Sequence, residues 1–215
     1  IYIIGRTAGE DKDNANWVGS YLLTDEEKEN LKNITEAFED VCVVLNVSNI
    51  IDLKWIDEEQ FKGHIKSVII VWQGGMEGGN SVADVLSGKV TPSGKLPDTI
   101  AYNMEDYPAN DNFGNELTNL YKEDIYVGYR YFETFAPEKV QFEFGFGLSY
   151  TTFDIETVSA DADDEKITLE VKVTNTGDKF SGKEVVQVYY EAPQGALGQP
   201  ARQLCAYEKT ENLAP

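Results

Sequence analysis

The stretch SVIIVWQGGMEGG, residues 67–79, contains the strongest strand signal in the chain and the turn that follows it. Residues 67–72 are almost continuously apolar rather than alternating, which is typical of a strand buried on both faces of a parallel sheet. The glycine-rich turn at 74–79 leads into a short helix at 81–86, which Gly88 is well placed to end. Strand, turn and helix together predict one βα unit of an α/β domain.

The residues before this unit repeat the alternation of strand and helix signals. Ile1–Ile4 and Val41–Val47 are apolar runs of strand length. Between them, Thr24 followed three residues later by Glu27 is the capping-box pattern that begins a helix. Continuous apolar strands separated by helices predict an α/β fold with a mostly parallel sheet sandwiched by helices.

Three further segments have weaker or different signals. The helix after Thr24 places Leu31, Ile34 and Phe38 on one face at helical spacing, and residues 52–63 are a weaker helix candidate. From 91 to 147, Pro, Gly, Asn and Tyr recur without a sustained period, so we expect a long ordered segment there. Its aromatic side chains at 121–135 favour interdomain packing, with stacking on sugars as the alternative.

The pattern changes after residue 150. Residues 167–173 alternate with period two, residues 184–190 do so in part, and a turn signal lies at 175–178 between them. These features predict an antiparallel β-sandwich. Because about four strands fit before the end of the chain and such a sandwich has roughly seven, we expect a partial sandwich. The predicted domains are therefore 1–150 and 151–215.

The composition excludes several classes of function. With 38 acidic and 18 basic side chains the formal charge is −20, which argues against nucleic-acid binding and against binding to anionic membranes. No apolar run reaches the ~20 residues of a membrane span. One histidine and two cysteines cannot by themselves complete a tetrahedral zinc site, so no metal or cofactor is expected. The acidic character and the lack of disulfide patterning favour a bacterial cytoplasmic protein.

Two catalytic motifs that the glycines suggest are not supported. The turn at 74–79 lacks the Gly-Lys-Ser/Thr ending of a P-loop and does not fit the dinucleotide-binding glycine pattern. A tight turn that lets the following helix pack against the sheet is the simpler interpretation. The sequence also contains no G-x-S-x-G, so an α/β-hydrolase nucleophile elbow is not supported.

Seven short motifs occur in a fixed order along almost the whole chain. They are WQGGMEGG (72–79), ADVLSG (83–88), PSGKLPDT (92–99), VGYRYF (127–132), FGFGLSYTTF (144–153), VTNTG (173–177) and GKEVVQVY (182–189). Each motif alone is weak, but the ordered series resembles family 3 glycoside hydrolases of the β-glucosidase type. The resembling parts are the α/β-sandwich domain and the start of the fibronectin-III-like domain that follows it.

The resemblance implies a role for one glutamate. In that family a (β/α)₈ barrel contributes an aspartate nucleophile, and the α/β-sandwich domain contributes the glutamate acid/base in a loop patterned R-x-x-G-E-G-x-D-R. This chain has RTAGEDKD at residues 6–13, so Glu10 resembles the acid/base. The chain departs from the pattern at Asp11, which replaces the usual Gly, and at Lys12, to which the basic residue is shifted.

The order of elements agrees with this location, since Glu10 follows an apolar strand and ligands of open α/β sheets gather beyond the carboxyl ends of strands. The implied function is a fragment of a retaining β-glucosidase that supplies an acid/base to a site shared with a barrel absent from these residues. Its implied partners are that barrel and a β-linked glucoside or oligosaccharide. The alternative for the chain is a non-catalytic module with a binding or assembly role, inactive as isolated. The alternative for Glu10 is an ordinary loop glutamate near a helix N-terminus.

Overall fold

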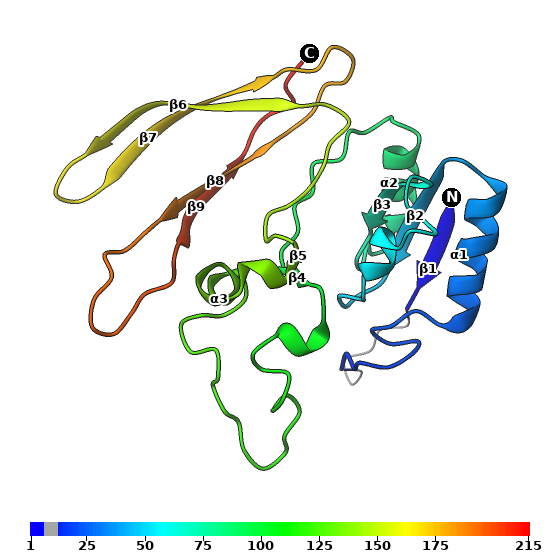
Figure 1. Ribbon diagram of the computed structural model, residues 1–215. Coiled ribbons are helices and arrows are strands. Elements are labelled where there is room, and N and C mark those ends of the chain that lie inside the picture. The colour runs from blue at the N-terminus through cyan, green and yellow to red at the C-terminus, as the bar shows by residue number, and fades with distance from the viewer. Residues whose placement is uncertain (7–12) are drawn as a thin grey trace. The chain divides into compact units, whose positions relative to one another are not determined.

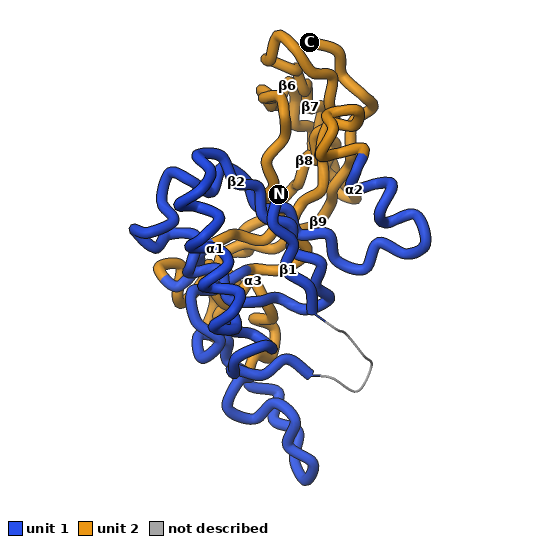
Figure 2. Tube along the Cα trace, turned by 90° about the vertical axis from the view of Figure 1, so that its right-hand side faces the viewer, with its two compact units in different colours: residues 1–83, 100–122, 139–141 blue, residues 84–99, 123–138, 142–215 orange. Residues whose placement is uncertain are grey.

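The computed structural model describes residues 1–6 and 13–215, which form two compact units. Unit 1 comprises residues 1–83, 100–122 and 139–141, and unit 2 comprises 84–99, 123–138 and 142–215 (Figure 2). The chain thus passes between the units several times rather than once. The division at residue 150 expected from the sequence stays a prediction.

A three-stranded parallel sheet forms the centre of unit 1. The strands β1 (Tyr2–Gly5), β2 (Val41–Asn46) and β3 (Ile65–Ile70) are ordered β1-β2-β3, with β2 in the middle (Figure 1). Val43 and Leu45 of the central strand are fully buried, as continuous apolar strands require. The predicted parallel sheet is therefore confirmed.

Helix α1 (Asp25–Ala37) begins at the predicted capping box. The Thr24 hydroxyl accepts the Glu27 N–H at 3.1 Å, and the Glu27 carboxylate accepts the Thr24 N–H at 2.8 Å. Leu31 and Thr35 are buried, but the predicted apolar face is wrong at Phe38, which is 64% exposed. Phe38 is the extended C-cap residue, so its side chain leaves the helical spacing from which the face was predicted.

The weak helix predicted at 52–63 is also wrong. Only η1 (Lys54–Asp57) is helical there, as a 3₁₀ turn, and bends and turns follow it. The indole N–H of Trp55 donates to the Asp52 carbonyl oxygen at 2.8 Å, and Trp55 is buried. Tertiary burial of this tryptophan favours tight i→i+3 turns over a regular helix.

The helix predicted at 81–86 forms, but it begins three residues earlier, inside the glycine-rich turn. Helix α2 spans Gly78–Leu86, and Gly88 follows it with φ at +75°, donating its N–H to the Val85 carbonyl. Helices commonly end with a glycine that has a positive φ at this position.

The middle of the chain contains short elements that the sequence pattern did not predict. They are β4 (Ile100–Ala101), η2 (Met104–Asp106), α3 (Tyr129–Phe135), η3 (Pro137–Lys139) and β5 (Val140–Phe142), with β4 and β5 paired. Helix α3 has only seven residues, which is shorter than the window of about 11–18 residues over which a helical hydrophobic period can be recognised.

Unit 2 contains two antiparallel pairs of strands. The first pair is β6 (Phe153–Ala162) with β7 (Ile167–Asn175), and the second is β8 (Val185–Tyr190) with β9 (Gln203–Lys209). The predicted succession of a parallel sheet and antiparallel strands is confirmed. In the part of the chain that the structure describes, no helix has the length and apolar character to cross a membrane.

Two of the glycine-containing motifs pack directly against each other within unit 2. Leu96 donates its N–H to the Phe146 carbonyl at 2.8 Å, and Gly145 donates to the Leu96 carbonyl at 2.8 Å. The Lys95 ammonium donates to the Gly147 carbonyl at 2.9 Å and pairs with the Glu184 carboxylate at 2.7 Å. The PSGKLPDT and FGFGLSYTTF motifs are therefore two sides of one backbone junction.

Candidate active site

The candidate acid/base, Glu10, lies outside the residues that the structure describes. The structure describes the segments on either side of it, which end at Arg6 and resume at Asp13. Because the sheet is parallel, the segments that leave β1, β2 and β3 emerge at the same edge. This carboxyl edge is where open α/β sheets bind ligands.

Arg6, the first residue after β1, connects three parts of unit 1. Its Nε donates to the Ser20 carbonyl at 3.2 Å, and its Nη2 donates to the Leu22 carbonyl at 3.4 Å. Both terminal nitrogens also bind the Glu27 carboxylate, with Nη2 to Oε2 at 2.8 Å. Residues 6 and 20–22 are thus held together beside the first turn of α1.

The Arg6–Glu27 ion pair is largely removed from solvent. The two side chains are 12% and 16% exposed. Burial by itself would raise the pKa of the Glu27 carboxyl, but the hydrogen bonds from Arg6 and Thr24 and the guanidinium charge hold that pKa below its ordinary value. Glu27 therefore stays a carboxylate, able to serve both as the helix cap and as the partner of Arg6.

Asn14 fixes the chain on the far side of residues 7–12. Its Nδ2 donates to the Ile50 carbonyl at 2.6 Å, and its Oδ1 accepts from the Ser20 hydroxyl at 3.3 Å. The same hydroxyl accepts the Ala15 N–H at 3.2 Å. Ser20 thus contacts both flanks, through its carbonyl to Arg6 and through its hydroxyl to Asn14 and Ala15.

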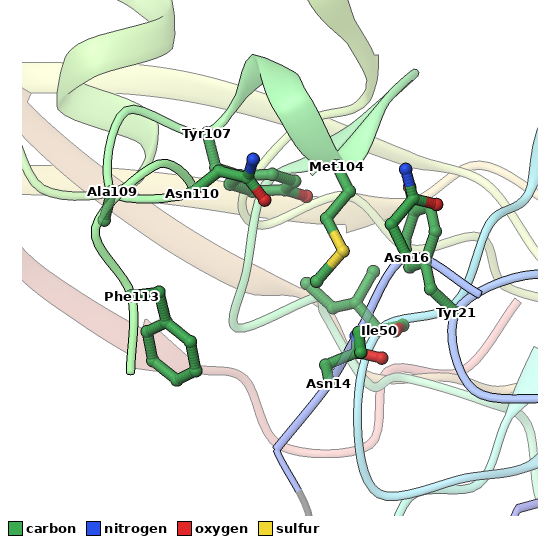
Figure 3. Close-up of a pocket in the computed structure, with 10 residues that line it drawn as sticks. Asn14, Asn16, Tyr21, Ile50, Met104, Tyr107, Ala109, Asn110 and Phe113 are labelled. Atoms are coloured by element: carbon green, nitrogen blue, oxygen red, sulfur yellow. Dashed lines mark hydrogen bonds between the residues drawn. The ribbon is translucent and has the colours of Figure 1, made fainter. Parts of the chain in front are cut away.

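A cavity of about 390 Å³ opens within unit 1 beside this flank. Figure 3 shows residues of 14–21 facing residues of 107–113, with Met104 between them. The lining side chains combine amides with aromatic and apolar groups: Asn14, Ala15, Asn16, Tyr21, Ile50, Met104, Tyr107, Ala109, Asn110 and Phe113. Asn16 Nδ2 also donates to Glu105 Oε1, which connects the two segments directly.

The electrostatic surroundings of the pocket are acidic. Tyr21 is 2% exposed, and burial first of all, then Tyr107 and the nearby acidic groups Asp52, Glu105 and Asp106, raise the pKa of its phenol. Among the described residues its hydroxyl has no hydrogen-bond partner. A pocket in this environment disfavours anions and suits neutral ligands.

Trp72 is a second unusual residue at the carboxyl edge, and the sequence did not reveal it. It follows β3 and has φ at +53°, a left-handed conformation that is rare for a bulky side chain. Such backbone is maintained only where the surrounding structure fixes it. Residue type carries no signal of this conformation, so only the three-dimensional structure identifies it.

Apart from Tyr121, which belongs to unit 1 and is exposed, the aromatic residues of 121–135 lie in unit 2 and contact other residues of that unit. Tyr129 stacks on Phe144 with ring centroids 4.8 Å apart, and Tyr126 meets Phe135 edge-on at the same separation. The Tyr129 hydroxyl also accepts the Leu204 N–H at 2.7 Å. Packing within unit 2 therefore explains why most of the aromatic side chains of this segment are present.

Within residues 1–6 and 13–215, no group of three or more His, Cys, Asp or Glu side chains is arranged to hold a metal ion. Cys42 and Cys205 are both free thiols. The ionisable chemistry near the carboxyl edge is therefore that of the carboxylates and Arg6.

Comparison with known proteins places most of the chain in one family. Residues 1–129 match the model of the glycosyl hydrolase family 3 C-terminal domain, and residues 184–215 match that of the fibronectin type III-like domain. A beta-glucosidase of Ruminococcus albus is 54% identical over 215 residues, covering 100% of this chain and 22% of the relative. Beta-glucosidase A of Butyrivibrio fibrisolvens is 47% identical, covering 92% of this chain and 25% of the relative.

Solved structures agree. A beta-glucosidase from Paenibacillus barengoltzii superposes with a TM-score of 0.96 at 59% identity, covering 99% of this chain and 24% of that chain. Beta-glucosidase 3B from Thermotoga neapolitana superposes with a TM-score of 0.89 at 38% identity, covering 99% of this chain and 30% of that chain. The chain thus spans about a quarter of the length of these relatives.

Proposed function

The chain belongs to glycosyl hydrolase family 3, and we propose that it is part of a retaining β-glucosidase in which Glu10 is the general acid/base. The observation that carries the proposal is the position of Glu10 in the RTAGEDKD segment, which leaves β1 at the carboxyl edge of the sheet. A relative named a beta-glucosidase matches the whole chain at 54% identity, which supports the same activity here.

The proposed reaction requires a second carboxylate, which we assign to a part of the protein outside these 215 residues. In a retaining mechanism the two carboxyl groups lie about 5–5.5 Å apart, one attacking the anomeric carbon and the other protonating the glycosidic oxygen. We assign the second role to Glu10 and the first to an aspartate of a (β/α)₈ barrel elsewhere in the same protein. Glu10 then removes a proton from the water that releases the sugar from the aspartyl intermediate.

The pocket beside Asn14 suits the leaving group of such a substrate. Asn16 and Asn110 offer amide hydrogen-bonding groups, and Phe113 and Tyr107 offer aromatic surface. A pyranose ring presents hydroxyl groups together with an apolar face, and the acidic surroundings favour a neutral ligand of this kind over an anionic one. We therefore propose that a sugar of an oligosaccharide substrate contacts this pocket as it leaves.

Truncating Phe113 tests the pocket assignment. In the full-length protein, Phe113→Ala is expected to raise KM for cellobiose by about 3–10-fold, the loss of one aromatic contact, with kcat much less affected. Phe38→Ala is a matched control, because Phe38 is also in unit 1 and is equally exposed at 64% but does not line the pocket. Equal effects of the two substitutions on KM would remove Phe113 from the substrate site.

Hydrolysis of a panel of p-nitrophenyl glycosides tests the function itself. We expect β-glucoside cleavage when these residues are combined with the barrel domain, and no cleavage by the 215-residue chain alone, which lacks the proposed nucleophile. Circular dichroism of each part establishes that both are folded. Folded partners that form a complex without cleaving any glycoside would instead favour a binding or assembly role.

A further inference from the structure

Resting on the proposed function, we propose that Arg6 is a positioning residue for the acid/base, acting through its buried ion pair with Glu27. No contact between Arg6 and the substrate is implied. The inference follows from what Arg6, Glu27 and Asn14 hold in place on the two sides of residues 7–12.

Arg6 fixes the chain at the point where it leaves the sheet. Its guanidinium binds the Ser20 and Leu22 carbonyls and both oxygens of Glu27, so all three of its nitrogens are used. The Gly5 carbonyl accepts a further hydrogen bond from Nη1 at 3.0 Å. A planar guanidinium can satisfy this fork of acceptors, whereas a lysine ammonium provides a single point charge. The identity of residue 6 is therefore matched to its surroundings.

Glu27 connects this anchor to the helix. Its Oε2 accepts from Arg6 at 2.8 Å and from the Thr24 N–H at 2.8 Å. The start of α1 and the end of β1 are consequently held by one carboxylate. Strand and helix are rigid elements, so their junction provides a firm reference for the segment that begins at residue 7.

Asn14 provides the corresponding anchor on the other side. It is bonded to the Ile50 carbonyl in the segment after β2 and to Ser20, which itself binds Arg6. The two anchors therefore share Ser20 and belong to one hydrogen-bond network. Proton transfer depends on sub-ångström placement of the acid, and a displacement of about 1 Å can cost about 100-fold in rate.

The test is a leaving-group series measured on the full-length protein with Arg6→Lys. We expect kcat/KM to fall by about 10–100-fold for cellobiose and for 4-methoxyphenyl β-glucoside, whose departure needs a well-placed acid. For 2,4-dinitrophenyl β-glucoside, which departs without protonation, we expect a change of less than about 3-fold. A general loss of folded protein would instead lower all three by the same factor.

Two further variants make the result specific. Glu27→Gln keeps the shape of the partner but removes its charge, and we expect a smaller loss with the same dependence on the leaving group. Arg202→Lys is the matched control, because Arg202 forms a similar two-contact pair with Glu133 in unit 2. It is expected to leave the leaving-group dependence unchanged.

The results of these experiments distinguish a failure of the positioning role of Arg6 from a failure of the proposed function. Unaltered activity of Glu10→Gln would remove the proposed function itself. If Glu10→Gln is impaired but Arg6→Lys and Glu27→Gln, with unchanged melting temperatures, show no leaving-group dependence, the positioning role is wrong. If Arg6→Lys fails to fold, the Glu27→Gln series decides the question by the same criterion.

Discussion

In the full-length protein, Glu10→Gln is expected to lower kcat/KM for cellobiose by about 10²–10⁴-fold, which is the usual contribution of a positioned general acid. Glutamine keeps the size of the side chain but cannot donate the proton that the departing sugar oxygen requires. The loss should be much smaller when the substrate is 2,4-dinitrophenyl β-glucoside, since that leaving group departs unprotonated. Steady-state kinetics with both substrates measure the difference.

Glu39→Gln is the control for this substitution, because it makes the same chemical change at an exposed glutamate of unit 1 that lies outside the motif and the pocket. It should change kcat/KM by less than about 3-fold for either substrate, as expected of a solvated charge outside the reaction. A comparable loss in Glu39→Gln, or an equal loss for the two substrates in Glu10→Gln, would contradict the assignment of Glu10.

Gly147→Ala is expected to have the largest effect on stability. A Cβ at this position would lie well inside 3.0 Å of the Gly94 carbonyl oxygen, and it would also approach the Lys95 side chain. The clash is with backbone in the junction of Leu96 and Phe146, which cannot move away cheaply. We expect a cost of about 3 kcal/mol, or about 6–10 °C in melting temperature.

Gly195→Ala provides the comparison for that substitution in the same unit. A Cβ added at Gly195 meets nothing within 4 Å, so the change should be neutral or stabilising by at most about 1 kcal/mol. Thermal unfolding followed by circular dichroism compares the two variants directly. Equal melting temperatures for Gly147→Ala and Gly195→Ala would show that the junction between the two motifs is not tightly packed.

Much of the fold could be predicted because local signals and tertiary structure agree. The apolar run at 41–47 became the buried central strand of a parallel sheet, and Thr24 with Glu27 formed the predicted capping box. The run at 67–72 contributed to β3, but as an edge strand whose apolar side chains at 68–70 are only half-buried, so the burial on both faces predicted for it is wrong. The alternating segment at 167–173 became part of β7.

Other elements could not be predicted because their stabilising contacts are distant in sequence or lack a period. Helix α3 spans only seven residues, too few for its helical period to be distinguished from the irregular sequence around it. The turns after Lys54 follow from burial of Trp55 rather than from local propensity. Phe38 has the spacing of a core residue but lies at the point where the backbone stops being helical.

The candidate site likewise has one part that the sequence predicts and other parts that it does not. Glu10 is predicted from a motif that extends over a few neighbouring residues, which a sequence displays fully, and this assignment stays a prediction. The pair formed by Arg6 and Glu27 spans 21 residues, and the pocket brings 14–16 beside 104–113. Neither the register of those segments nor the positive φ of Trp72 is encoded in any short pattern.

Trapping of the glycosyl-enzyme intermediate with azide tests whether Glu10 is the acid/base. In the full-length protein with Glu10→Ala, azide needs no general base to attack the glucosyl–aspartate intermediate formed from 2,4-dinitrophenyl β-glucoside. The carbon–oxygen bond to the aspartate breaks as the carbon–nitrogen bond forms, which gives a glucosyl azide. We expect azide to accelerate turnover and to yield β-glucosyl azide, identified by NMR. Unchanged turnover with azide and free glucose as the sole product would contradict the assignment of Glu10 as the acid/base.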